Sequence, residues 1–208
     1  GHGTWFGRLL DAAAPGDVTL VAQDWGGPIA LWAAADRLAR VRGLVVGNTV
    51  VGPPRPGFKA SAFHRLARLP LVSDALFKLG GFPQNLMTLA QGKKTSIVGR
   101  AALGYMWPLR RLGDRTAPLA LARMVPDAMD HPSFPALERC QEVFTALRAP
   151  VSLVWGMRDP VLGRVLGHLE RLRPDARVTR TDAGHFLQEE VPGPIAAAIR
   201  DVAGMRFN

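Results

Sequence analysis

Apolar runs of strand length alternate with helical patterns at both ends of this 208-residue chain. Strands that are apolar along their whole length are typical of a parallel sheet with helices on both faces, because only there are both sides of a strand buried. The expected fold class is therefore α/β, with a mostly parallel sheet flanked by helices. Strands are predicted at 17–23, 42–48, 150–156 and, more weakly, 176–181, and helices at 5–12, 27–40, 161–172 and 193–204.

The middle of the chain has a different pattern. It opens with the turn-rich sequence GPPRPG at 52–57, and no convincing buried strand follows before about residue 135. We expect an all-helical insertion, a cap at 53–135, over a core formed by residues 1–52 and 136–208. Short helical patterns recur in this insertion at about 60–68, 72–79, 83–91, 95–104 and 115–124.

Charge and cysteine content narrow the possible partners. The net charge of +9 comes from 22 Arg and 4 Lys, but the arginines are scattered and lack the interleaved aromatic residues of a single-strand binding surface. We therefore expect solvated helix faces and no nucleic-acid partner. No apolar run approaches the roughly 20 residues of a membrane helix, so no membrane partner is expected. The single cysteine, Cys140, fits a buried thiol in a cytoplasmic protein.

A carboxylate follows the first predicted strand, in VTLVAQDWGGPIALW at 18–32. The five residues from Ala22 to Gly26 match the small-x-nucleophile-x-Gly pattern of a nucleophile elbow, with Asp24 at its centre. An ionised carboxylate at this turn needs no base to act as a nucleophile, and the helix that follows presents its positive end. A purely structural interpretation is that Asp24 only caps that helix.

Two more loops complete a set of three residues. Asp159 follows the next apolar strand in VSLVWGMRDPVLG, and His185 follows the last strand in TDAGHFLQEEVP. Alone, Asp159 could cap a helix or form a turn, and His185 could be structural. The order nucleophile, acid, histidine, each after a strand, is that of the α/β-hydrolase triad and favours catalysis.

Four stretches resemble haloalkane dehalogenases of the α/β-hydrolase superfamily: AQDWGGPIAL, VVGNTVVGPP, LVWGMRDPVLG and DAGHFLQEEVP. The resemblance covers nearly the whole chain. It implies that Asp24 is the nucleophile, His185 the base and Asp159 the acid that orients the histidine. It also implies that Trp25 donates a hydrogen bond to the halide. In some members the acid follows the strand before the cap, where this chain has Asn48, so Asp159 keeps the role.

The implied reaction cleaves a carbon–halogen bond hydrolytically through an alkyl ester on Asp24, giving alcohol, halide and a proton. The expected ligands are a small halogenated substrate and a halide ion, with no cofactor and no metal. Epoxide hydrolases share the Asp-Trp elbow, but they normally use two cap tyrosines, and the only tyrosine here is Tyr105. The chain could also be a non-catalytic binding protein on the same scaffold, or an inactive fragment.

Two family features have no match in the sequence. Halide usually has two donors, and the only tryptophan in the cap, Trp107, cannot be placed by pattern. The usual oxyanion loop lies far upstream of the nucleophile, whereas only 23 residues precede Asp24. We therefore expect a fragment that lacks the first strands, the oxyanion loop and one halide donor. Such a fragment should be a poor enzyme, with an aggregation-prone edge at 17–23.

Overall fold

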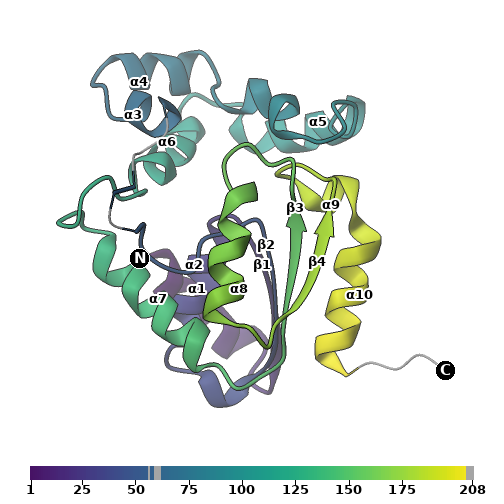
Figure 1. Cartoon of the computed structure of the whole chain (residues 1–208). Helices are drawn as coiled ribbons and strands as arrows, with labels where there is room; N and C mark the ends of the chain where they lie inside the picture. The colour runs from purple at the N-terminus through teal and green to yellow at the C-terminus, as the bar shows by residue number, and fades with distance from the viewer. Residues whose placement is uncertain (56, 59–61, 205–208) are drawn as a thin grey trace.

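A four-stranded parallel sheet forms the centre of the protein, as a computed structural model shows (Figure 1). The structure describes residues 1–55, 57–58 and 62–204. All neighbouring strands pair in parallel, in the order β1-β2-β3-β4. The predicted α/β class is thus confirmed. The strands are β1 (Val18–Gln23), β2 (Val41–Gly47), β3 (Val151–Gly156) and β4 (Arg177–Thr181).

Helices cover both faces of this sheet (Figure 1). In β3, Leu153 and Trp155 face one layer of helices and Val154 faces the other, so the strand is apolar along its whole length. The first layer consists of α1 (His2–Ala13), α2 (Gly26–Ala34), α7 (Phe134–Ala146) and α8 (Leu166–Leu172), and the second is α10 (Pro192–Ala203).

Cys140 of α7 lies in the first of these two layers, as predicted. It is a free cysteine with 2% of its surface exposed, and burial raises the pKa of its thiol to about 11. Val21 of β1 is 51% exposed on the strand that ends the described sheet. The expected aggregation through this edge stays a prediction.

Two predicted helices begin or end elsewhere. The helix predicted at 27–40 stops at Ala34, where the Arg37 guanidinium bonds the Ala33 carbonyl (2.9 Å) and the Asp11 carboxylate of α1. A short 3₁₀ helix, η1 (Leu38–Arg40), then leads into β2. The helix predicted at 161–172 begins later, with η6 (Gly163–Val165), because the amides just before it bond a side chain of the site described below. Both differences come from side-chain contacts, which helical periodicity does not register.

The predicted cap, residues 53–135 and called the cap segment below, lies for the most part beyond the carboxyl ends of the strands (Figure 1). Its described residues contain helices and no strand, and it has a small core of its own around Phe77 and Leu119. The helix predicted at 60–68 begins in residues outside the described ones, and the one predicted at 95–104 starts only at Gly99. The helices are α3 (Ala62–Ala67), α4 (Val72–Asp74), η2 (Ala75–Leu79), η3 (Gln84–Ala90), α5 (Gly99–Met106), η4 (Trp107–Leu109), η5 (Gly113–Arg115) and α6 (Thr116–Arg123).

Candidate active site

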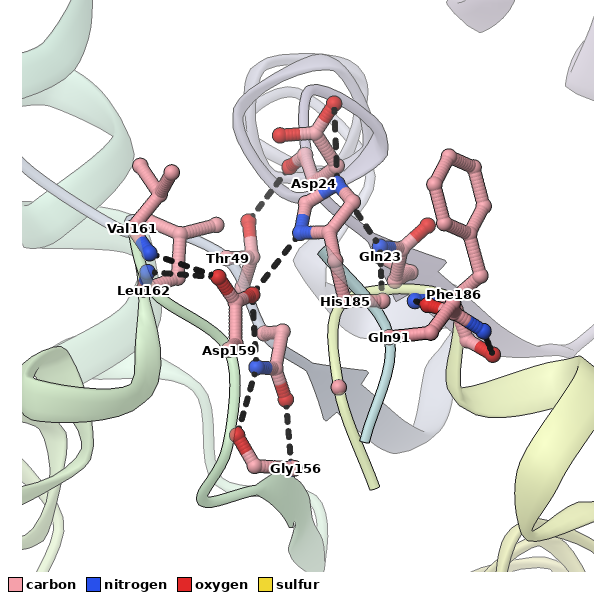
Figure 2. Close-up of polar contacts among 12 residues, drawn as sticks. Gln23, Asp24, Thr49, Gln91, Gly156, Asp159, Val161, Leu162, His185 and Phe186 are labelled. Atoms are coloured by element: carbon pink, nitrogen blue, oxygen red, sulfur yellow. Dashed lines mark hydrogen bonds and ion pairs between the residues drawn. The ribbon is translucent and has the colours of Figure 1, made fainter. Parts of the chain in front are cut away.

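Three loops at the carboxyl edge of the sheet bring the predicted triad together (Figure 2). His185, from the loop after β4, lies between two carboxylates. Its Nδ1 is 2.8 Å from Oδ2 of Asp159, after β3, and its Nε2 is 4.0 Å from Oδ2 of Asp24, after β1. Parallel strands all end at the same edge, which is why residues so far apart in sequence meet here.

Asp24 sits at a strained turn. Its φ is +50°, in the left-handed region that few non-glycine residues adopt. Its backbone N–H donates to the carbonyl of Asn48 (3.1 Å), and its carbonyl accepts from the Thr49 hydroxyl (2.6 Å). Helix α2 has Trp25 at its N-cap position and no side-chain cap hydrogen bond. The interpretation of Asp24 as merely a cap of this helix is therefore wrong.

The double glycine after the elbow has a packing reason. A Cβ on Gly27 would lie 2.0 Å from the Thr49 Oγ1 that holds the Asp24 carbonyl, so a side chain cannot fit there. A Cβ on Gly26 would meet nothing closer than 3.9 Å. The steric demand thus falls on Gly27 rather than on Gly26, the glycine of the sequence pattern.

The two oxygens of Asp159 have different partners. Oδ1 accepts from the backbone N–H groups of Val161 (2.8 Å) and Leu162 (3.0 Å), which holds the loop before η6. Oδ2 accepts from His185 Nδ1 (2.8 Å) and Asn48 Nδ2 (2.8 Å). Oδ1 thus makes the turn contacts of the structural interpretation, and Oδ2 faces the histidine as the triad interpretation expects.

Asn48 is a positioning residue that the sequence analysis did not recognise as such. It is fully buried, and besides Asp159 it contacts the backbone of Gly156. Its Nδ2 donates to the Gly156 carbonyl (3.0 Å) and its Oδ1 accepts from the Gly156 N–H (2.7 Å). Asn48 thereby joins the end of β2 to the end of β3 and fixes the Asp159 carboxylate. The sequence held two signals for it: its place at the end of a predicted strand, and its position where some family members carry the acid.

The surroundings shift the pKa values of the two carboxyl groups in opposite directions. Desolvation by the pocket raises the pKa of Asp24, although the nearby His185 partly offsets this. Burial would also raise the pKa of Asp159, but the His185 bond and charge and the Leu162 and Asn48 bonds lower it overall. For His185, burial lowers the pKa, but the Asp159 bond and the charges of both carboxylates outweigh it and raise it.

The histidine loop is clamped against the cap segment. The His185 N–H donates to the Ala90 carbonyl (2.8 Å), and the Phe186 N–H donates to Oε1 of the buried Gln91 (2.9 Å). A Cβ on Gly184 would lie 2.2 Å from the Ala90 carbonyl oxygen, so only glycine permits this approach. Beside it, the Gln23 amide donates to the His185 carbonyl (2.9 Å).

Glu190, at the end of α9 (Leu187–Glu190), completes this clamp. Its carboxylate accepts from the N–H groups of Gly184 (2.6 Å), Lys93 (2.6 Å) and Gly92 (3.2 Å), and from the Ser96 hydroxyl (3.0 Å). Burial opposes ionisation, but these four donors lower the pKa of Glu190 overall. No sequence pattern indicated this role.

A largely apolar cavity of about 950 Å³ opens onto Asp24 and His185. Trp25 lines it next to Asp24, and its implied hydrogen bond to a halide stays a prediction. Trp107 and Tyr105 are not among the described residues that line it. Trp107 is 66% exposed, and the Tyr105 hydroxyl donates to Glu189 (2.9 Å).

Comparisons with known proteins give the family of the chain. A profile of the alpha/beta hydrolase fold family matches residues 2–192. Haloalkane dehalogenase 2 of Mycobacterium tuberculosis is 30% identical over 203 residues, which are 95% of this chain and 68% of that protein. The chain belongs to the haloalkane dehalogenase family. The members of this family are hydrolytic enzymes, and the chain spans about two thirds of the length of that relative.

Other relatives of this haloalkane dehalogenase family member point the same way. A haloalkane dehalogenase of Mycobacterium marinum is 29% identical over 199 residues, covering 94% of this chain and 63% of the relative. The crystal structure of haloalkane dehalogenase DbeA from Bradyrhizobium elkani is 24% identical and superposes with a TM-score of 0.82, over 97% of this chain and 72% of that one. This likeness shows the shared fold.

Two further properties concern the described residues alone. Their helices are all too short or too polar to cross a membrane. They contain no group of three or more His, Cys, Asp or Glu side chains arranged to hold a metal ion.

Proposed function

We propose that this family member hydrolyses a carbon–halogen bond through an alkyl ester on Asp24, with the cap segment as the lid of the site. The observation that carries the proposal is the place of His185 between two carboxylates. Nδ1 is bonded to Asp159, which leaves Nε2 facing Asp24 at 4.0 Å, across the space where a water would attack an ester. A base held in one tautomer beside a nucleophile is the arrangement that two-step hydrolysis requires.

In the first step, an oxygen of Asp24 attacks the carbon that bears the halogen. The carbon–oxygen bond forms while the carbon–halogen bond breaks, and the bonding electron pair leaves with the halide. No proton is transferred. The departing anion needs a donor inside an apolar cavity, and the indole N–H of Trp25 can only donate.

In the second step, His185 Nε2 takes a proton from water, and the resulting hydroxide attacks the ester carbonyl carbon. The tetrahedral intermediate expels the alkoxide, which takes the proton of the newly formed Asp24 carboxylic acid, so that the alcohol leaves and the carboxylate is restored. The imidazolium then releases its proton to solvent. Asp159 stabilises that imidazolium, and its buried bond from Asn48 keeps it in place.

The test separates these two steps with His185→Phe and excess 1-bromobutane. Because Asp24 needs no base, one bromide per active site should appear in a burst, followed by almost no turnover. Mass spectrometry should find the butyl group on the Asp24 peptide. Asp24→Asn should give neither burst nor adduct, because an amide is a poor nucleophile, and asparagine tolerates the left-handed φ at this turn.

His168→Phe is the matched control, since His168 lines the same cavity but has no place in the triad. This variant should turn over steadily. Sustained bromide release by His185→Phe, or an adduct on another residue, would contradict the mechanism. An adduct from epoxides but not from bromoalkanes would favour epoxide hydrolysis, against which the Tyr105 hydroxyl, bound to Glu189, argues. A binding protein or an inactive fragment would form no adduct from either.

A further inference from the structure

Positive charge is concentrated in the cap segment. Residues 53–135 contain twelve of the 26 lysines and arginines but only four of the 17 aspartates and glutamates. The segment therefore carries eight of the nine net positive charges, and the rest of the chain is nearly neutral. Arginines are scattered along the whole sequence, but most of the acidic residues that could balance their charge lie outside the cap segment.

Exposed apolar side chains are concentrated in the same segment. Of the described residues, 17 large apolar side chains are exposed, and twelve of them lie between residues 53 and 135. Four form what we call the cap patch: Leu79 (68% exposed), Leu103 (69%), Trp107 (66%) and Leu112 (54%). A surface that is both cationic and apolar is unusual for a face that meets only water.

The members of the cap patch lie on elements that contact one another in series. Leu79 ends η2, which contacts η5; η5 contacts η4, and η4 contacts α5. The Arg115 guanidinium fastens this series by donating to the carbonyls of Lys78 (2.9 Å) and Leu109 (2.8 Å). The four exposed side chains therefore lie on one continuous series of packed elements of the cap.

Uncompensated cations border the cap patch. The Arg110 guanidinium lies 4.3 Å from the centre of the Trp107 ring. Arg100, Arg110 and Arg111 are exposed, and none of them takes part in the ion pairs that the described residues form. Their charges are available to a partner.

We propose that the cap patch docks this protein on an anionic lipid surface. Tryptophan is enriched at the boundary between headgroups and acyl chains, leucine side chains insert just below it, and arginines bind anionic headgroups. A second copy is a poor partner, since two cap segments of the same charge repel each other. Nucleic acid fits less well, because leucine side chains cannot stack on bases.

Interfacial docking needs no membrane-spanning helix, since an amphipathic surface lies on the bilayer rather than across it. The lack of a long apolar run in the sequence therefore concerns membrane-spanning helices only, and not docking on the bilayer surface. The cap segment also lines the cavity, through Pro83, Leu86 and Met87 among others, so docking would hold the cavity close to the bilayer. The proposal does not depend on the reaction, and binding can be measured without a substrate.

The test is flotation with vesicles of phosphatidylcholine alone and of phosphatidylcholine in which about one lipid in three is phosphatidylglycerol. The protein should partition at least roughly tenfold more strongly into the anionic vesicles, and high salt should remove most of that difference. Binding should also shift tryptophan emission to the blue, and Trp107→Phe should abolish most of the shift.

Matched substitutions identify the surface. Two double variants are compared with the unchanged protein: Leu103→Gln with Trp107→Gln, and Arg110→Gln with Arg111→Gln. Each should lower partitioning into anionic vesicles about tenfold while circular dichroism stays unchanged. Trp5→Gln is the apolar control, because Trp5 on α1 is also 66% exposed.

Arg148→Gln with Arg200→Gln, both exposed on the core, is the charge control. The proposal would be overturned by equal binding to neutral and anionic vesicles, or by controls that weaken binding as much as the cap variants do. Binding to DNA or polyglutamate without binding to vesicles would also overturn it.

Discussion

The turn after β1 and the loop after β3 both carry a carboxylate at the same edge of the same sheet, but the two carboxylates differ in exposure, hydrogen bonding and pKa. The Asp24 side chain is 45% exposed toward the cavity, and its pKa is raised. The Asp159 side chain is fully buried, accepts four hydrogen bonds, and has a lowered pKa. Position in the fold is thus shared, while solvation and hydrogen bonding differ.

This difference fits two chemical tasks. A nucleophile needs an oxygen with a free lone pair directed at the substrate, and the Asp24 side chain makes no cap hydrogen bond to the helix that follows it. An orienting acid needs a fixed carboxylate that favours the ionised form, and four donors hold Asp159 in place while its pKa is lowered. Substitutions around each carboxylate should therefore affect different steps of the proposed reaction.

The largest effect is expected from Asp159→Asn, which changes the carboxylate after β3. An amide nitrogen facing His185 Nδ1 would favour the wrong tautomer, so ester hydrolysis should slow by about 10⁴-fold while the bromide burst remains. Because the Asp159 charge raises the pKa of His185, its loss lowers that pKa, and the residual rate should persist to lower pH. Single-turnover rates between about pH 5 and 9 measure both, and a slowed burst would count against the division of tasks.

A smaller effect is expected from Trp25→Phe, on the first step, in which Asp24 attacks and halide leaves. Loss of one preorganised donor should slow the first step by about 10²-fold, and ester hydrolysis should be unaffected. Stopped-flow bromide release measures the first step, and adduct decay measures the second. Equal slowing of both steps, or of neither, would remove Trp25 from the halide site.

Asn48→Ala tests the link between the two turns. It leaves the buried Gly156 N–H without its acceptor and removes one donor from Asp159. The free energy of unfolding should fall by about 2 kcal/mol, and ester hydrolysis should slow about tenfold. Urea titration and adduct decay measure these two quantities. Unchanged stability would show that water replaces the lost acceptor at no cost.

The smallest effect is expected from Glu190→Gln, which replaces an acceptor of four hydrogen bonds with a group that can also donate. The histidine loop should loosen, so that ester hydrolysis slows a few-fold and adduct accumulates during turnover. Glu189→Gln is the matched control, because the neighbouring Glu189 side chain bonds Tyr105 and makes no contact with the histidine loop among the hydrogen bonds of the described residues. A burst slowed as much as ester hydrolysis would indicate a general loss of structure.

The alternation of apolar strands and helices was enough to predict the parallel sheet and the place of each triad residue. Asp24, Asp159 and His185 each follow a strand, and parallel strands end at one edge, so local pattern implies proximity. Helix ends were less accurate. The end of α2 depends on the contact of Arg37 with Asp11, 26 residues away, and periodicity within the helix carries no trace of it.

The sequence by itself thus determined the sheet, the family and the meeting of Asp24, Asp159 and His185 at one edge, because each of these depends on residue type, order and local periodicity. Only the tertiary structure decided that Asn48 supports Asp159 and that Glu190 ties the histidine loop to the cap segment. The bond from Asn48 to Asp159 and those from Lys93 and Ser96 to Glu190 join residues 94 to 111 positions apart. The same holds for the cap patch around Trp107. Whether a side chain is exposed depends on how the helices pack. A leucine in an amphipathic pattern looks the same in the sequence whether another element covers it or not.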